Sequence, residues 1–278
     1  MKQNYLTEAI HLINMLVSSK TFFIERERYD NIFSINLVLN NKEYAESLFG
    51  VNPNLSESKY LYFDIYKIDN SDDYTLLIEN KFKYDNLNDT DKRNDNLFGE
   101  DFNQIRNNGI FDLLGKYILR NGVDNEGEII IYQKAILKYS ELLQAKNFPD
   151  KSPADIYEAL FKIVLWHEMG HWASHWLEDK KNNRWDNQYY KYVRPEDKDL
   201  HEGLAQAFTY WAIMGCNTDE YLLLSMIFNS LTLSQPKQYK TYHQIISKTK
   251  DFNKFLDAIT EIRSLNFVPR LDNLLSYL

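Results

Sequence analysis

The 278-residue chain has a single cysteine, Cys216, and no run of 18 apolar residues. One cysteine excludes an intrachain disulfide and suits a reducing compartment. Without a long apolar run, no segment is typical of a membrane-spanning helix. The first residues also lack the uninterrupted apolar stretch of a secretion signal, because His11 and Asn14 interrupt Ile10 to Val17. The sequence therefore predicts a cytoplasmic protein with no membrane partner, with export by a non-classical route as the open alternative.

Positive charge is also scarce, since 32 Lys and Arg residues stand against 40 Asp and Glu residues, which gives a formal net charge of −8. No stripe of Lys and Arg along the chain overrides this balance. Nucleic-acid binding needs a basic patch, so we expect no nucleic-acid partner. No internal repeat stands out, and a hydrophobic content of 44% allows one substantial core. Nothing in the sequence indicates the oligomeric state.

The most informative segment is the pentapeptide His167-Glu168-Met169-Gly170-His171. Residues four apart on an α-helix lie on one face, so the two imidazoles can reach one metal ion while Glu168 lies one step round the helix. This spacing is typical of a Zn²⁺ site in which the glutamate activates a zinc-bound water. A bland alternative is a core helix whose two histidines are hydrogen-bonded and whose glutamate is solvated.

The residues around this motif favour a helix that faces the interior. Ser152 is a candidate N-cap, Pro153 suits the first helical position, and Asp155 can reach back to the cap. A glycine inside a helix costs about 1 kcal/mol relative to alanine, so Gly170 indicates that another backbone or a substrate comes close. A single stripe at helical spacing contains Ile156, Leu160, Ile163, Val164, His167, His171 and Ser174.

A tetrahedral zinc site needs a third protein ligand, and the best candidate is Glu202. It lies in a second helical pattern over residues 200–211, in which Leu200, Leu204, Phe208 and Trp211 form one stripe. Ala205 is small enough for a close approach between the two helices. Gln206, one turn beyond Glu202, can hydrogen-bond a ligating group from the second shell.

Other interpretations of Glu202 stay open. Asp199 and Glu202 fit a capping box, and Glu202 also suits a surface ion pair. The third ligand can instead be another side chain, such as His201, Asp199 or Glu178. His175 lies about 12 Å along the helix axis from His167, too far to share one ion with both other histidines. We therefore expect His175 to have a second-shell or structural role.

These two segments resemble the zincin metallopeptidases whose third ligand is a glutamate, the gluzincins. The segment from Glu202 to Phe208 is also similar to the Glu-x-x-Ala-Asn-x-Phe segment of the ImmA/IrrE-type peptidases, with Gln206 where that family commonly has Asn or Asp. The resemblance covers roughly residues 126–214 and implies a zincin-like fold, bound zinc and hydrolysis of a protein or peptide substrate. It also implies that substrate lies beside an edge strand; the β-rich segment 127–132 is either that edge or an interior strand.

In the implied mechanism Glu168 is the general base, which takes a proton from the water and returns it to the leaving amine. The related peptidases use a Tyr or His to stabilise the charge on the carbonyl oxygen. The candidates here are His243 as a catalytic residue and Tyr210 and Tyr242 as substrate-binding residues, although any one tyrosine of 20 is more often ordinary packing.

The remaining patterns predict an α+β chain with an antiparallel or mixed sheet in an amino-terminal lobe (1–125) and a mainly helical carboxy-terminal lobe (126–278), together one compact unit. Segment 85–108 is rich in Asn and Asp, which favours a mobile loop or a connection between the lobes. The other expected elements are a helix over 4–18, a strand over 33–39, a hairpin of 60–68 with 75–84, and helices over 135–143, 218–233, 236–248, 251–265 and 271–278.

Three hypotheses follow. The favoured one is a zinc metallopeptidase of narrow specificity, which loses hydrolysis but keeps zinc when Glu168 becomes Gln. The alternative is a non-catalytic protein-binding module stabilised by zinc, which requires a fourth protein ligand and no bound water. The third is a helical interaction module without metal.

Overall fold

The computed structural model describes residues 63–69, 72, 74–93, 97–119, 127–176, 198–263, 265 and 267–278. The helix predicted over 4–18 and the strand predicted over 33–39 lie outside these residues. Within the described part, the chain is mostly helical with one small sheet, which confirms the α+β class in its general form.

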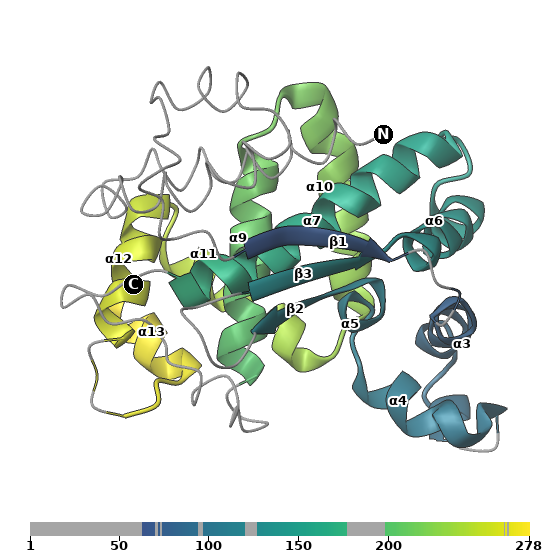
Figure 1. Cartoon of the computed structure of the whole chain (residues 1–278), viewed down its shortest axis with the longest axis horizontal. Helices are drawn as coiled ribbons and strands as arrows, with labels where there is room; N and C mark the ends of the chain where they lie inside the picture. Colours follow the sequence, from purple (N-terminus) through teal and green to yellow (C-terminus); the bar gives the residue numbers. More distant parts are fainter. Residues whose placement is uncertain are drawn as a thin grey trace.

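The sheet has three strands, β1 (Phe63–Asp69), β2 (Gly115–Leu119) and β3 (Gly127–Tyr132), in the order β1-β3-β2. Strand β3 pairs parallel with β1 and antiparallel with β2, so the sheet is mixed. Figure 1 shows the three strands side by side. Segment 127–132 is therefore the interior strand, and β2 is an edge of the described sheet. Because β3 lies between two strands from residues 1–125, the two predicted lobes share one sheet.

The described residues between β1 and β2 form short helical elements. They are α3 (Thr75–Asp85), η2 (Asp91–Arg93), η4 (Gly99–Asp101), α4 (Phe102–Asn107) and α5 (Phe111–Leu114). Strand β1 pairs with β3 and not with the segment that directly follows it in sequence. This topology excludes the predicted hairpin.

The hairpin prediction was wrong because Thr75–Asp85 is a helix. Its buried residues are Ile78 and Lys81, and the ammonium of Lys81 lies 2.9 Å from a carboxylate oxygen of Asp85. This three- and four-residue spacing is that of one helical face, and the straight-chain residues of the segment favour a helix over a strand. A short apolar run does not by itself distinguish the two.

Segment 85–108, predicted to be a mobile loop or a connection between the lobes, contains short helical elements where the structure describes it. The Asn88 side chain accepts hydrogen bonds from the backbone N–H groups of Thr90 (3.1 Å) and Asp91 (2.9 Å), which folds the chain into a turn. Further on, Phe102 and Ile105 are buried. The few apolar residues of this segment are thus sufficient to anchor it to the core.

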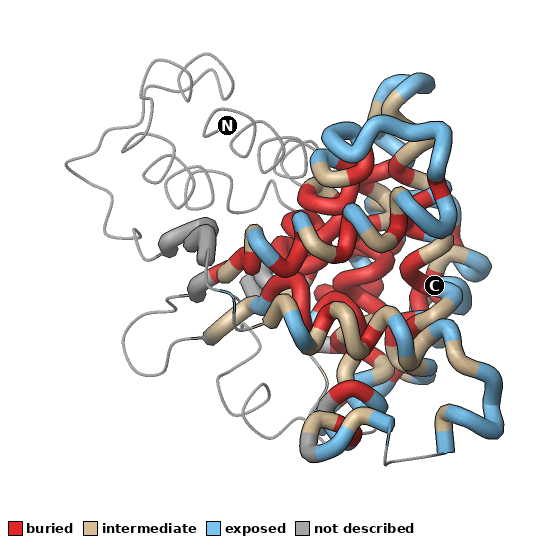
Figure 2. The backbone as a smooth tube through the Cα atoms, turned by 90° about the vertical axis from the view of Figure 1, so that its right-hand side faces the viewer, coloured by how far each residue is buried: buried red, intermediate tan, exposed pale blue. Residues whose placement is uncertain are grey.

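The carboxy-terminal part is helical, as predicted. Its elements are α6 (Gln133–Asn147), α7 (Pro153–Trp176), α9 (Lys198–Met214), α10 (Thr218–Ser234), η5 (Lys237–Lys240), α11 (Tyr242–Lys248), α12 (Phe252–Arg263) and α13 (Leu271–Tyr277). Helix α7 contacts α9, α6, α10 and the strands β2 and β3, so it occupies the centre of the described body. Figure 2 shows buried backbone concentrated there. Among the described residues, no helix has the length and hydropathy needed to cross a bilayer.

Candidate metal centre

Helix α7 begins as predicted. The Ser152 hydroxyl accepts a hydrogen bond from the backbone N–H of Ala154 at 3.2 Å, and Pro153 is the first helical residue. The predicted stripe is turned inward, and His167 is only 1% exposed. Burial of this face places both imidazoles of the motif against the neighbouring helix.

Helices α7 and α9 touch through their backbones at Gly170. A Cβ atom added there would lie 2.8 Å from Cα of Ala205, 2.9 Å from its carbonyl oxygen and 3.1 Å from Cβ of Phe208. This confirms the predictions that another backbone comes close to Gly170 and that the small Ala205 permits it. The close approach brings the first turn of α9 up to the histidines.

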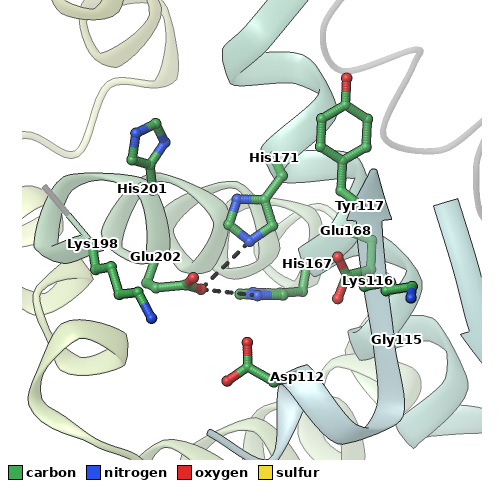
Figure 3. Close-up of a pocket in the computed structure, with 10 residues that line it drawn as sticks. All are labelled: Asp112, Gly115, Lys116, Tyr117, His167, Glu168, His171, Lys198, His201 and Glu202. Atoms are coloured by element: carbon green, nitrogen blue, oxygen red, sulfur yellow. Dashed lines mark ion pairs between the residues drawn. The ribbon is translucent and has the colours of Figure 1, made fainter. Parts of the chain in front are cut away.

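The structure brings His167, His171 and Glu202 together. Oε2 of Glu202 lies 3.3 Å from Nε2 of His167 and 3.4 Å from Nε2 of His171, and one ligand atom from each residue lies within 4.8 Å of the other two. Figure 3 shows both imidazoles directed at this carboxylate. Zinc binds His and Glu atoms at about 2.0–2.1 Å, so two corners of a zinc tetrahedron are roughly 3.4 Å apart. The two measured distances fit that edge length.

The electrostatics of the three groups also suit a cation. Burial lowers the pKa of His167 to about 4, so this imidazole is neutral at pH 7. Burial alone would raise the pKa of Glu202, but the two imidazoles hold it well below its usual value. His171 behaves differently: burial would lower its pKa, yet Glu202 raises it to about 8. An ionised carboxylate beside a neutral imidazole is what zinc requires, and only His171 has to lose a proton.

The alternative interpretations of Glu202 receive less support. Helix α9 begins at Lys198, so Asp199 is inside the first turn and is not the N-cap of a capping box. The carboxylate of Asp199 instead pairs with Lys237 at 3.5 Å. His201 lines the same pocket, but it does not belong to the converging group of ligand atoms in the described chain. Glu178 lies outside the described residues.

Glu168 is 3% exposed and lies against the edge strand. Its carboxylate accepts a hydrogen bond from the backbone N–H of Tyr117, and burial raises its pKa to about 8. The strand comes this close because Gly115 has no side chain: a Cβ there would lie 2.9 Å from Cγ1 of Val164 and 3.2 Å from Cγ of Glu168. The proposed general base is therefore held between the metal-binding helix and the main chain of β2.

These groups open into a pocket of about 220 Å³. The motif and Glu202 form one side of it, and the other lining residues are Asp112, Gly115, Lys116, Tyr117, Lys198 and His201. Except for His201, sequence analysis did not identify this second group. Gly109 and Gly115 were the only indication of a close approach in this part of the sequence, and they do not reveal which side chains face the pocket.

Asp112 is the most firmly held of these residues. Its Oδ2 accepts hydrogen bonds from the backbone N–H of Gly109 at 2.7 Å and from the hydroxyl of Tyr239 at 2.8 Å. The preceding residue, Phe111, stacks on His167 with ring centres 4.3 Å apart. One short segment thus fixes both a pocket carboxylate and the orientation of a proposed metal ligand.

The structure does not bring the other predicted site residues into this pocket. Tyr242 is 1% exposed and packs against Phe228 (ring centres 5.3 Å apart) and Tyr210 (6.3 Å), while His243 is exposed on α11. None of the three predicted substrate or oxyanion residues lines it. The side chain of His175 lies outside the described residues.

Gln206 is fully buried, and its side-chain amide has no hydrogen-bond partner within the described chain. Nδ1 of His167 is likewise buried without a partner there. The predicted hydrogen bond from Gln206 to a ligating group is therefore not seen. Because neither group has another partner within the described chain, the Gln206 amide and Nδ1 of His167 can still take part in such a hydrogen bond.

Comparison with protein-family models, curated proteins and solved structures gave no match. The function is therefore argued from the geometry of this site.

Proposed function

We propose that this chain is a zinc-dependent metallopeptidase of the gluzincin type, with His167, His171 and Glu202 as the zinc ligands. The observation that carries the proposal is the pair of distances of 3.3 and 3.4 Å from the Glu202 oxygen to the two imidazole nitrogens, which match two edges of a zinc tetrahedron. In the described chain the converging group has three members, which leaves a fourth position for water or substrate. That count favours a catalytic site over a closed structural one.

When bound, zinc supplies a Lewis acid for the peptide carbonyl and a water of lowered pKa. Glu168 is the residue that moves the proton: its carboxylate accepts one from the attacking water and passes it to the leaving amine nitrogen. Its hydrogen bond to the backbone of Tyr117 fixes the direction of the carboxylate. Burial excludes competing solvent from this proton transfer.

A protein or peptide is the substrate class that the surroundings of Glu168 favour. Strand β2 is an edge of the described sheet and lines the pocket through Gly115, Lys116 and Tyr117. An extended peptide can add to such an edge through main-chain hydrogen bonds. The small volume of the pocket supports narrow specificity. The finer fold class, a zincin-like arrangement of sheet, metal helix and glutamate helix, belongs to the same proposal.

The test is zinc analysis of the purified protein combined with the variant Glu168→Gln. We expect about one zinc per chain in both proteins and a loss of hydrolysis of a quenched-fluorescent peptide library of at least about a hundredfold in the variant. Glu158→Gln is the matched control, because Glu158 is exposed on the same helix. Equal hydrolysis by Glu168→Gln would contradict the proposal. Zinc held by four protein ligands, without hydrolysis, would instead support a non-catalytic zinc-stabilised binding module.

A further inference from the structure

Two lysines line the metal pocket, and they differ in what they contact. Lys116 belongs to β2, beside Glu168, and its Nζ lies 5.9 Å from the ring centre of Tyr132. Lys198 is the first residue of α9 and is exposed. Within the described chain Lys198 has no ion-pair or hydrogen-bond partner. Among the described residues, Lys116 thus has an aromatic ring beside its ammonium group, whereas Lys198 lacks even that contact.

Lys198 stands between two acidic residues in sequence; Asp197 lies outside the described residues, and Asp199 does not neutralise it. The carboxylate of Asp199 already pairs with Lys237, whose side chain is 84% exposed and does not line the pocket. Within the described residues, Lys237 of η5 is thus paired at the surface, and Lys198 at the start of α9 is unpaired at the pocket. This contrast supplies a matched control.

The direction of Lys198 is visible in Figure 3. Its side chain extends toward the carboxylates of Glu202 and Asp112 from the side of the site opposite Glu168. Asp112 is fixed by Tyr239 and by a backbone N–H. Burial and the charge of Glu202 raise the pKa of Asp112, while the ammonium of Lys198 acts in the opposite direction. The two groups are therefore in electrostatic contact, which favours the inward orientation of the lysine.

Amide hydrolysis needs a positive group on that side. As the water oxygen bonds to the carbonyl carbon, the carbonyl oxygen gains negative charge, and a donor aimed at it stabilises the transition state. The exposed Lys116 and the half-buried Tyr117 are other donors of the pocket, and both belong to β2 on the side of Glu168. His201 is only 5% exposed. Lys198 is charged and exposed, and it lies on the side of the site opposite Glu168.

We propose that Lys198 is a catalytic residue that donates a hydrogen bond to the carbonyl oxygen of the scissile peptide bond as this oxygen becomes negative; the inference rests on the proposed peptidase function. The water oxygen bonds to the carbonyl carbon, one water proton passes through Glu168 to the leaving nitrogen, and the C–N bond breaks. The second water proton leaves the new carboxyl group for the released amine, so the products are a carboxylate and an ammonium group. Lys198 stays protonated throughout, so it neither gives up nor takes a proton in the reaction.

The experiment compares zinc-loaded wild type with Lys198→Met, Lys198→Arg and the control Lys237→Met. The substrate is the library peptide that the wild type cleaves fastest, and the second probe is a peptide phosphonate, whose tetrahedral anion resembles the transition state. We expect Lys198→Met to lower kcat by about 100- to 1000-fold with little change in KM. The phosphonate Kd, measured by calorimetry, should rise at least about tenfold. Lys198→Arg should recover part of both losses, and Lys237→Met should behave as wild type with the same zinc content.

Two results would overturn the inference while leaving the peptidase function intact. A raised KM with unchanged kcat would mean that Lys198 only anchors the bound substrate. Wild-type kcat and phosphonate affinity in Lys198→Met would mean that it has no role. If the zinc-loaded wild type neither hydrolyses the library nor binds the phosphonate, the proposed function itself fails, and this inference fails with it.

Discussion

Replacing Gly170 with alanine should weaken zinc binding although this residue is not a ligand. The new methyl group would lie 2.8 Å from Cα and 2.9 Å from the carbonyl oxygen of Ala205, and both atoms belong to the backbone of α9. Neither atom can rotate away. Ordinary carbon contacts need about 3.5 Å or more, so the two helices must separate by roughly half an ångström.

The magnitude follows from two opposing effects. Alanine gains about 1 kcal/mol over glycine inside a helix, whereas overpacking costs about 1–3 kcal/mol, so the metal-free protein loses between about 0 and 2 kcal/mol of unfolding free energy. Zinc binding is more sensitive, because Glu202 moves with α9 while His167 and His171 stay on α7. A shift of about half an ångström exceeds the 0.2 Å tolerance of zinc–ligand distances. We expect the zinc Kd to rise at least about tenfold.

Chelator competition measures the zinc Kd, and urea unfolding of the metal-free protein measures stability. The control is Gly203→Ala, whose Cβ would meet the side-chain hydroxyl of Thr241 and not α7. This variant is expected to lose some stability and to keep its zinc affinity. Wild-type zinc affinity in Gly170→Ala would refute the argument, and equal weakening in both variants would show that the effect is not specific to the α7–α9 contact.

Three further predictions concern the pH dependence, the ligand support and the helix start. Glu202 raises the pKa of His171 to about 8, so zinc must displace a proton from His171 below that pH. The zinc affinity should therefore rise up to pH 8 and then level. Calorimetry in buffers of different ionisation enthalpy should show about one proton released on zinc binding at pH 7. No proton release would contradict this pKa. Gln206→Leu should raise the zinc Kd about 10- to 100-fold if its amide supports Nδ1 of His167 on metal binding, and an unchanged Kd in chelator competition would exclude that support. Ser152→Ala should lower the unfolding free energy by about 1 kcal/mol in urea through loss of the N-cap, with zinc affinity unchanged; no loss of stability would show that the cap is unimportant.

The helices of the candidate metal site could be predicted because the patterns that indicate them are local. The cap at Ser152, the spacing of His167 and His171, and the position of Gly170 all lie within one helix. For α9 the same periodicity identified Glu202, although only the fold could show that its carboxylate faces the histidines. Local patterns therefore identified the candidate ligands His167, His171 and Glu202, and the packing of α7 on α9 brings them together.

The wall of the pocket could not be predicted in this way. Strand β2 has five residues, too few for a pattern, and its role depends on pairing with β3 and on contact with α7. Asp112 is fixed by Tyr239, which lies 127 residues later. Lys198 precedes the apolar stripe of α9 and resembles any surface lysine. Long-range contacts of this kind leave no trace in the spacing of neighbouring residues.

The adjacency of Phe111 and Asp112 couples two properties that a protein engineer would want to vary separately. Phe111 stacks on the ring of His167, and Asp112 lines the pocket. On the proposed function, a loop exchange designed to accept a different cleavage sequence would therefore also alter how firmly zinc is bound. Variants selected for new preferences should therefore come with altered metal requirements. A redesign that starts from the β2 side, at Lys116, avoids this linkage.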